Sequence, residues 1–372
     1  MYMGVTCWLV HAPSTSSSTI RHIDAAGVSA AARQTKNKSL DLIFRFLQNA
    51  LVKCGQTNQA HHCVRSLENE MTYEIAALRQ DPEFTTFSAS PVGGTLGAHI
   101  EGLDISQPLS DAAATEIQQA LVHYQVLFFH DLDLTPAAHA QFAKVFGEVQ
   151  MGGTIPRLEE QPEVKKQEYT QQASVGGDVN MHADDTFKEI PSRCSLLYGV
   201  DMPPAGGDTI WINTEAAYAA LSDPMKTMLN DLTAVHDLAA RFGLNSWGNP
   251  DHKMRQTIEE HYPPVEHPVI RIHPESGRKS IFVNEMVTTR INGIPEDESK
   301  VLLEFLISHL KKPDFQVRLH WPKTGTLVVW DNRSTQHLVL GDFQPQYRLN
   351  HRVAIEDTVK PQGPAEALRS VA

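Results

Sequence analysis

The chain has 372 residues, of which 41% are hydrophobic and 20% charged, a composition typical of soluble globular proteins. Its net charge of −12 argues against nucleic acid and anionic membranes as partners, and no apolar run approaches the roughly 18 residues that a membrane-spanning helix needs. Only four cysteines are present, three of them before residue 70, so we expect no disulfide framework and a reducing compartment such as the cytoplasm.

The first seventy residues differ from the rest in charge. They hold seven Lys or Arg against four Asp or Glu, and residues 1–36 are rich in Ser, Ala and Thr without periodicity. We predict that residues 1–72 are an extension, disordered or dispensable, and that residues 73–372 form the functional domain. Three alternatives stay open: a mitochondrial transit peptide, a true start at Met71, and a folded role for this segment.

The rest of the chain predicts many short strands and a few helices. Strands are expected at residues 86–91, 97–102, 126–129, 195–198, 209–212, 315–321, 326–330 and 351–355. Helices are expected at 110–124, 135–147, 223–232 and 295–312, the last with Val301, Leu302, Phe305, Leu306 and Leu310 facing inward. Residues 243–264 are polar and read as a long irregular excursion of the kind that often forms a lid. This pattern favours a mainly β fold with flanking helices, a double-stranded β-helix or jelly-roll barrel.

One short motif carries metal-binding chemistry. His182 and Asp184 stand two positions apart, and on a strand such residues project from the same face. His337, just beyond the apolar strand at 326–330, is the best candidate for a third ligand. Two histidines and one carboxylate leave the other metal positions open, which is the arrangement of non-haem Fe(II) oxygenases.

Two arginines follow the third ligand. Arg348 lies eleven residues after His337, and Arg352 lies four further on, so on a strand both share a face. An oxygenase of this kind needs two extra electrons, which a 2-oxo acid can supply. The planar guanidinium of an arginine suits the far carboxylate of such an acid.

In these features the chain resembles the TauD/TfdA (taurine dioxygenase) family of Fe(II)- and 2-oxoglutarate-dependent dioxygenases, over roughly residues 83–358. The resemblance is carried by His182-Ala183-Asp184 with Thr186-Phe187, Pro204-Ala205-Gly206-Gly207-Asp208-Thr209, His267-Pro268-Val269, Phe282-Val283-Asn284-Glu285, Trp330-Asp331-Asn332-Arg333, Gln336-His337 and Arg348-x-x-His351-Arg352.

The resemblance implies roles for single residues. His182, Asp184 and His337 match the ligands of Fe(2+), and Arg348 with Thr209 matches the residues that bind 2-oxoglutarate. For the substrate, Arg352 matches an arginine that binds its anionic group, and Phe242 is a weaker match to an aromatic residue above it. The implied reaction consumes O2 and 2-oxoglutarate, releases succinate and CO2, and hydroxylates a C–H bond. In sulfonates and aryl ethers that hydroxylation cleaves the C–S or C–O bond.

The chain also departs from the family pattern. No histidine follows Phe146-Gly147-Glu148 closely, which makes taurine itself a poor fit. Asp185 replaces a small or aliphatic residue and either contacts a cationic group of the substrate or serves as a turn or salt-bridge residue. Arg352 favours an anionic substrate, with a structural ion pair as the alternative reading, and Asp184 argues against halogenation.

We therefore expect an oxygenase acting on a small organic acid, such as an alkylsulfonate, a sulfate ester, an aryloxyalkanoate or a modified amino acid. Two functions of other classes remain in view. One is a catalytically silent module that binds a metal and a small acid, and the other is a zinc hydrolase with the same three ligands. A homo-oligomer, dimer or tetramer, is expected from the family.

Overall fold

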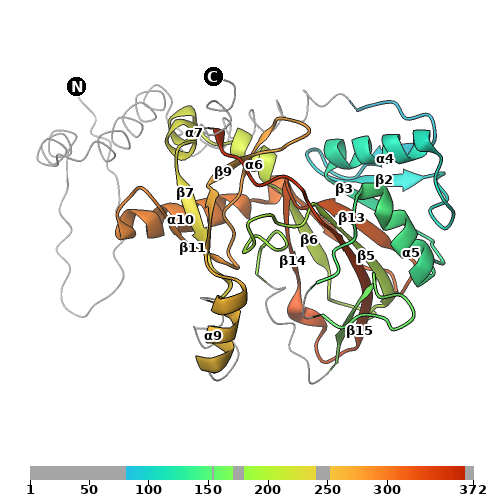
Figure 1. The fold of residues 1–372 in the computed structure, drawn as a ribbon. Helices are drawn as coiled ribbons and strands as arrows, with labels where there is room; N and C mark the ends of the chain where they lie inside the picture. Colours follow the sequence, from blue (N-terminus) through green and yellow to red (C-terminus); the bar gives the residue numbers. More distant parts are fainter. Residues whose placement is uncertain (1–80, 153–154, 171–179, 240–251, 365–372) are drawn as a thin grey trace, which may run out of the picture. The chain divides into compact units, whose positions relative to one another are not determined.

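The computed structural model describes residues 81–152, 155–170, 180–239 and 252–364, which belong to one unit of the chain, Glu70–Ala372 (Figure 1). The fold is mainly β with flanking helices, as predicted from the sequence. Phe242 and the extension 1–72 lie outside the described residues. The boundary at residue 72 therefore stays a prediction.

Four sheets form the β part of the unit. The largest has seven strands in the order β1-β2-β3-β13-β5-β15-β4, and all its neighbours are antiparallel except β2 and β3. Its strands are β1 (Ser88–Pro91), β2 (Ala98–Glu101), β3 (Val126–Phe129), β13 (Leu327–Asp331), β5 (Cys194–Asp201), β15 (Arg348–Ile355) and β4 (Lys165–Tyr169). One three-stranded sheet consists of β12 (Gln316–Leu319), β6 (Thr209–Asn213) and β14 (Thr335–Val339). Another consists of β11 (Thr288–Ile291), β7 (Thr233–His236) and β8 (Val265–Pro268). The two-stranded sheet pairs β10 (Lys279–Ile281) with β9 (Ile270–Ile272).

Six α-helices accompany these sheets in the described residues. They are α4 (Asp111–Tyr124), α5 (Pro136–Ala143), α6 (Thr214–Ala219), α7 (Asp223–Leu229), α9 (His252–His261) and α10 (Glu296–Leu310). Helix α4 begins where the sequence predicts, because the Ser110 hydroxyl accepts a hydrogen bond from the Ala113 amide at 3.3 Å. Three short 3-10 turns, η1 (Lys144–Phe146), η3 (Pro313–Phe315) and η4 (Gly341–Phe343), complete the helical elements.

The elements stack in layers with three main apolar clusters between them. One cluster joins the seven-stranded sheet to α4 and α5, which cover its outer face (Figure 1). A second fills the space between that sheet and β12-β6-β14, and the ring centroids of two of its three tryptophans, Trp211 and Trp330, lie 5.8 Å apart, both almost fully buried. A third packs α6, α7 and α10 against the smaller sheets. Two sheets therefore face each other across an aromatic core, and truncating either tryptophan to alanine would cost ~3–5 kcal/mol.

Three expectations from the sequence were wrong. Residues 252–261 form α9 instead of an irregular excursion, because this segment contains good helix formers and neither Gly nor Pro. On α10, Val301 and Phe305 are exposed to 67% and 43%, while Ser299 and His309 are buried instead. His182 is a single bridge residue and not part of a regular strand.

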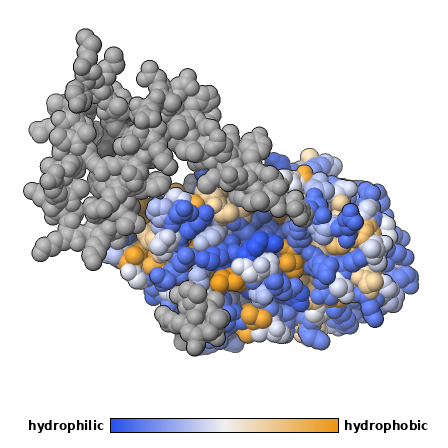
Figure 2. All heavy atoms as spheres, turned by 90° about the horizontal axis from the view of Figure 1, so that it is seen from above, coloured by the Kyte–Doolittle hydropathy of each residue, from blue (hydrophilic) through white to orange (hydrophobic). Residues whose placement is uncertain are grey.

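The surface is largely hydrophilic on the face shown in Figure 2, where apolar residues are scattered among polar ones. None of the helices in the described residues is both long and apolar enough to cross a bilayer.

Candidate active site

The three predicted ligands meet at one point. His182 and His337 form an isolated antiparallel bridge, with backbone hydrogen bonds of 3.0 Å and 2.7 Å in the two directions. Asp184 lies in the tight turn after His182, where Asp185 takes a left-handed φ of 60°. The Nε2 atoms of both histidines lie 3.8 Å from Asp184 Oδ1, and the three ligand atoms all lie within 4.8 Å of one another. The turn, and not a shared strand face, brings the carboxylate to the two rings.

The chemistry of these donors fits a divalent metal ion. The His182 Nδ1 faces the Asn180 carbonyl oxygen at 2.7 Å, which sets that nitrogen as the N–H and turns the Nε2 lone pair toward the centre. Burial lowers the pKa of His337 to about 3, so this ring is neutral, as a ligand must be. The Trp330 ring packs 4.8 Å from the His337 ring and holds its orientation. Two imidazoles and a carboxylate match a 2-His-1-carboxylate site.

The second oxygen of Asp184 is held by its surroundings. Oδ2 accepts hydrogen bonds from the Ser195 hydroxyl at 2.7 Å and from the Arg352 Nη2 at 2.6 Å. The side-chain amide of Asn332 lies 3.3 Å from the Ser195 Oγ and extends this chain of contacts. Burial raises the pKa of Asp184, but the Arg352 guanidinium beside it and the Ser195 hydrogen bond hold the net pKa far below the usual range. Asp184 therefore stays ionised and presents Oδ1 to the centre.

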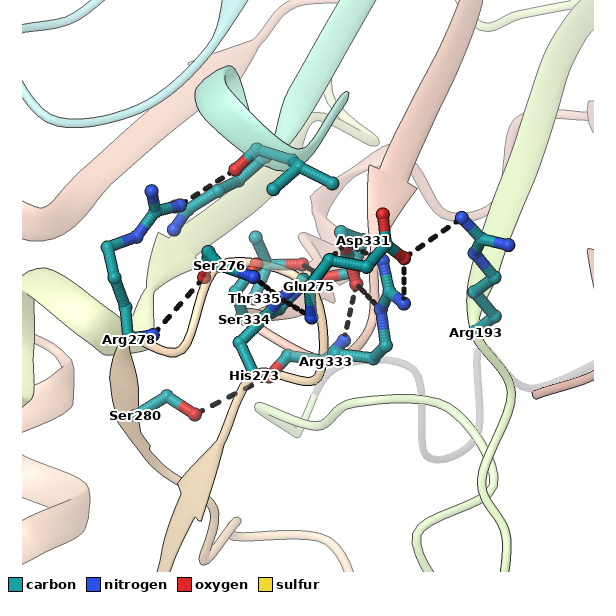
Figure 3. Close-up of polar contacts among 12 residues, drawn as sticks. Arg193, His273, Glu275, Ser276, Arg278, Ser280, Asp331, Arg333, Ser334 and Thr335 are labelled. Atoms are coloured by element: carbon teal, nitrogen blue, oxygen red, sulfur yellow. Dashed lines mark hydrogen bonds and ion pairs between the residues drawn. The ribbon is translucent and has the colours of Figure 1, made fainter. Parts of the chain in front are cut away.

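A buried ionic cluster fixes the hairpin that carries His337 (Figure 3). At the end of β13 the Asp331 carboxylate accepts from Arg333 at 2.9 Å and 2.7 Å and contacts the His273 Nε2 at 3.1 Å. Arg333 also pairs with Glu275 at 2.5 Å. Burial raises the pKa of Asp331, but the charge of Arg333 and the hydrogen bonds with Arg333 and His273 lower it far more, so the carboxylate stays ionised. The Trp-Asp-Asn-Arg motif is thus a structural device that sets β14 in place.

The two arginines of β15 lie on one face of the strand, as predicted. Arg348 is 2% exposed, and its guanidinium lies 5.5 Å from the Tyr169 ring centroid, 5.7 Å from that of Phe343 and 5.9 Å from that of Trp321. Such an aromatic cage holds a planar cation in a fixed orientation. The Trp321 Nε1 donates to the Thr209 hydroxyl at 2.9 Å, so Thr209 and Arg348 meet at the same indole. Their part in binding 2-oxoglutarate stays a prediction.

The environment of Asp185 favours the structural alternative for this residue. Its Oδ2 accepts from the Gln150 amide and the Ser192 hydroxyl, both at 2.6 Å, and pairs with Lys188 at 3.0 Å. Its positive φ marks it as the turn residue that brings Asp184 to the histidines. A contact with a cationic substrate group stays an untested expectation.

Sequence reasoning missed several residues around the site: Ser195 and Asn332 behind Asp184, Gln150 beside Asp185, and Lys165 and Asn350 beside Arg352. Residues 165–169, Lys-Lys-Gln-Glu-Tyr, show no alternation of apolar and polar side chains, so the sequence carried no signal for strand β4. The others become visible only when distant strands pair.

Comparison with known proteins agrees with this geometry. The model of the "Taurine catabolism dioxygenase TauD, TfdA family" matches residues 88–354. The chain belongs to the TauD/TfdA family. One relative is an alpha-ketoglutarate-dependent sulfate ester dioxygenase of Pseudomonas putida, which is 32% identical to this chain over 292 residues. The match covers 76% of this chain and 94% of that protein.

Solved structures are similar to this chain as well. A taurine dioxygenase from Burkholderia xenovorans has a TM-score of 0.65 and 31% identity, covering 76% of this chain and 93% of its own. AAD-2, solved with Mn(II) and N-oxalylglycine, has a TM-score of 0.63 and 28% identity, covering 75% and 100% of the two chains. Alpha-ketoglutarate is 2-oxoglutarate, so the sequence-based expectation of a 2-oxoglutarate-dependent dioxygenase that uses Fe(II) and O2 is confirmed for the TauD/TfdA family to which this chain belongs.

Proposed function

We propose that this chain is an Fe(II)- and 2-oxoglutarate-dependent dioxygenase that hydroxylates a small anionic substrate. The observation that carries the proposal is the convergence of His182, Asp184 and His337 within 4.8 Å, with Arg348 and Arg352 on one face of the adjoining strand. A sulfate ester, an alkylsulfonate and an aryloxyalkanoate are the substrate classes we propose to test. The sulfate ester is supported by the activity named for the Pseudomonas putida relative.

Each residue takes a distinct task in this proposal. His182, Asp184 and His337 hold the metal from one side, and Ser195 keeps the Asp184 carboxylate in its single orientation. Arg348 binds the far carboxylate of 2-oxoglutarate through its planar fork, with Thr209 beside it. When bound, Fe(II) with 2-oxoglutarate and O2 supplies the oxidising power for C–H hydroxylation, with succinate and CO2 as the other products.

Arg352 orients the substrate beside the same metal site. Its Nη2 contacts Asp184, and an anionic group bound to the guanidinium therefore lies close to the metal site. Holding the acidic end in this way aims one carbon of the substrate at the metal. In a sulfate ester the hydroxylated carbon also carries the sulfate, so the product collapses: the hydroxyl oxygen becomes the carbonyl oxygen of an aldehyde, the C–O bond to sulfate breaks, and sulfate leaves with the hydroxyl proton.

The finer fold assignment belongs to the same proposal. We infer a double-stranded β-helix, which the face-to-face packing of the seven-stranded sheet on β12-β6-β14 supports. A homo-oligomer and a cytoplasmic location are proposed from the family and from the paucity of cysteines.

The test is anaerobic addition of Fe(II) and 2-oxoglutarate to the purified chain, followed by visible absorption. We expect a weak metal-to-ligand charge-transfer band that is absent in His182→Ala and in Arg348→Ala. The matched control is His351→Ala, because His351 lies on the same strand but points to the opposite face. A well-folded, iron-loaded chain without the band would refute the proposal and leave the silent module. Hydrolysis without oxygen would instead support the zinc hydrolase.

A further inference from the structure

Lys165 is a buried lysine next to the candidate active site. Lys165 is 5% exposed. In the described part of the chain its ammonium group makes one hydrogen bond, to the Gln150 side-chain oxygen at 2.8 Å, and no ion pair. An ammonium group has three N–H donors, and buried charges in proteins are normally paired because their desolvation is costly. A lysine that is buried beside only a neutral amide points to an anion that binds there.

Asn350 is a second buried polar group without a partner. It is fully buried, and within the residues that the structure describes neither its Nδ2 nor its Oδ1 has a hydrogen-bond partner. A buried polar atom without a partner keeps an unfavourable desolvation cost, which a bound ligand can relieve. The residue lies between Arg348 and Arg352 on β15. The Nδ2 group of Asn350 can donate to an anion that binds beside these arginines.

The pairing of β15 with β4 places these residues on one face. Arg352 is directly opposite Lys165, and Asn350 is directly opposite Gln167. Residues opposite each other on antiparallel strands project to the same face of the sheet, with Cβ atoms about 4.5–5.5 Å apart. The contact of Arg352 with Asp184 identifies this face as the one that borders the metal site.

The carboxylates near Lys165 are paired with other cations, so the lysine can pair with a bound anion. Asp184 is shared by Arg352 and the candidate metal site, and Asp185 pairs with Lys188, so the nearby carboxylates already have cationic partners. The charges that act on Lys165 come from Arg352 on β15, Asp184 and Asp185 in the metal loop, and Arg157 before β4. Burial lowers the pKa of Lys165 to about 8, so at pH 7 most of the molecules carry the charge.

We propose that Lys165 and Asn350, together with Arg352, bind the acidic group of the substrate. Three donor groups from two strands surround the anion, which suits the three outer oxygens of a sulfate or sulfonate better than the two of a carboxylate. This inference rests on the proposed function and deepens it, because it assigns residues of this chain to substrate selection.

A purely structural role for Lys165 makes different predictions. If the lysine served only to hold Gln150, and through it Asp185, its loss would destabilise the fold and disturb the metal loop. If it binds an anion, Lys165→Met removes an unpaired buried charge at similar volume, and the free protein should be as stable as wild type or more so.

The experiment titrates hexyl sulfate into the full chain loaded with Mn(II) and N-oxalylglycine, in which an NH replaces one CH2 of 2-oxoglutarate, and measures binding calorimetrically. We expect Lys165→Met to weaken hexyl sulfate binding roughly 10- to 100-fold and Asn350→Leu roughly 3- to 10-fold. Neither variant should change the affinity for N-oxalylglycine or lower the melting temperature. The control is Lys166→Met on the same strand, whose ammonium pairs with Glu168 at 2.8 Å and whose side chain is 37% exposed.

The outcomes separate the two proposals. This inference is overturned if the affinity of Lys165→Met for hexyl sulfate is within twofold of the wild-type affinity. It is also overturned if Lys166→Met loses as much hexyl sulfate affinity as Lys165→Met. If Lys165→Met has a lower melting temperature and no longer binds N-oxalylglycine, the lysine has a structural role, and the inference that it binds an anion is overturned. Wild-type chain that binds neither Mn(II) nor N-oxalylglycine refutes the proposed function itself. If the wild-type chain binds Mn(II) and N-oxalylglycine but none of hexyl sulfate, hexanesulfonate and phenoxyacetate, then the proposal of an acidic substrate and this inference are both refuted.

Discussion

The hydroxyl of Ser195 provides a sharp test of how the protein holds its metal ligand. Ser195 is fully buried, and its Oγ donates to Asp184 Oδ2 at 2.7 Å. The substitution Ser195→Ala removes this hydrogen bond without adding volume. The Arg352 Nη2, 2.6 Å from the same oxygen, keeps the carboxylate in the site but lets it rotate about its remaining contact.

The magnitude follows from the charge of the acceptor. A hydrogen bond to a charged group contributes ~1.5–3 kcal/mol, and each ~1.4 kcal/mol is a factor of ten in a dissociation constant. Since Arg352 still contacts Oδ2, we expect the lower end of this range, a loss of roughly tenfold in metal affinity. Removal of groups that orient metal ligands typically weakens metal binding by about 10- to 100-fold.

The assay is the dissociation constant for Mn(II), measured by competition with a fluorescent chelator. Ser192→Ala is the matched control, because Ser192 is 2% exposed and its hydroxyl donates at 2.6 Å to Asp185, the neighbour of the ligand. Both variants should lose similar stability, and only Ser195→Ala should lose metal affinity. The reasoning fails if Ser195→Ala binds Mn(II) as tightly as wild type, or if Ser192→Ala weakens binding equally.

Three further predictions concern charge. The pKa of Lys165 is lowered to about 8, so the lysine is cationic below that pH and neutral above it. The KM for an acidic substrate should therefore rise as the pH passes 8, and in Lys165→Met it should stay high and flat; a wild-type KM that does not change across pH 8 would contradict this. Arg348→Ala should raise the KM for 2-oxoglutarate by roughly 30-fold or more, through loss of a buried charge-assisted contact. Arg348→Lys should recover little of it because an ammonium group lacks the planar fork, and full recovery would argue against bidentate binding. Asp331→Asn removes the buried one of the two carboxylates that pair with Arg333 and leaves only Glu275. It should therefore cost ~3 kcal/mol of unfolding free energy, the lower end of the range for a broken buried ion pair, in urea titrations at neutral pH. The pKa of Asp331 lies well below its usual value, so its contribution is present above about pH 4 and is lost as the pH falls toward its folded pKa. The difference between wild type and Asp331→Asn should therefore shrink in acid, and a constant difference would show that the charge is not what stabilises the hairpin.

Much of the site could be predicted from sequence because its signals are local. The spacing of His182 and Asp184, and that of Arg348 and Arg352, lies within single segments, and the chemistry of those residue types narrows the choice of ligand. Strands and helices with strong apolar patterns were also predictable, such as β3, α4 and β15. The errors fell on α9, a polar stretch whose helix was not predicted, on His182, which forms a single bridge, and on the exposed face of α10. For α10, periodicity alone does not show which side meets the core.

The sequence by itself therefore determined the residue types of the metal ligands and the two arginines. Only the tertiary structure decided which residues surround them. Ser195 reaches Asp184 because β5 lies between β13 and β15, and Lys165 lies opposite Arg352, 187 positions later in the chain, because β4 pairs with β15 in one register. A shift of that register by one residue would turn every side chain of β4 to the other face. Pairing between distant strands leaves no trace in a single sequence, and for this reason the buried lysine and asparagine beside the site became visible only in the fold.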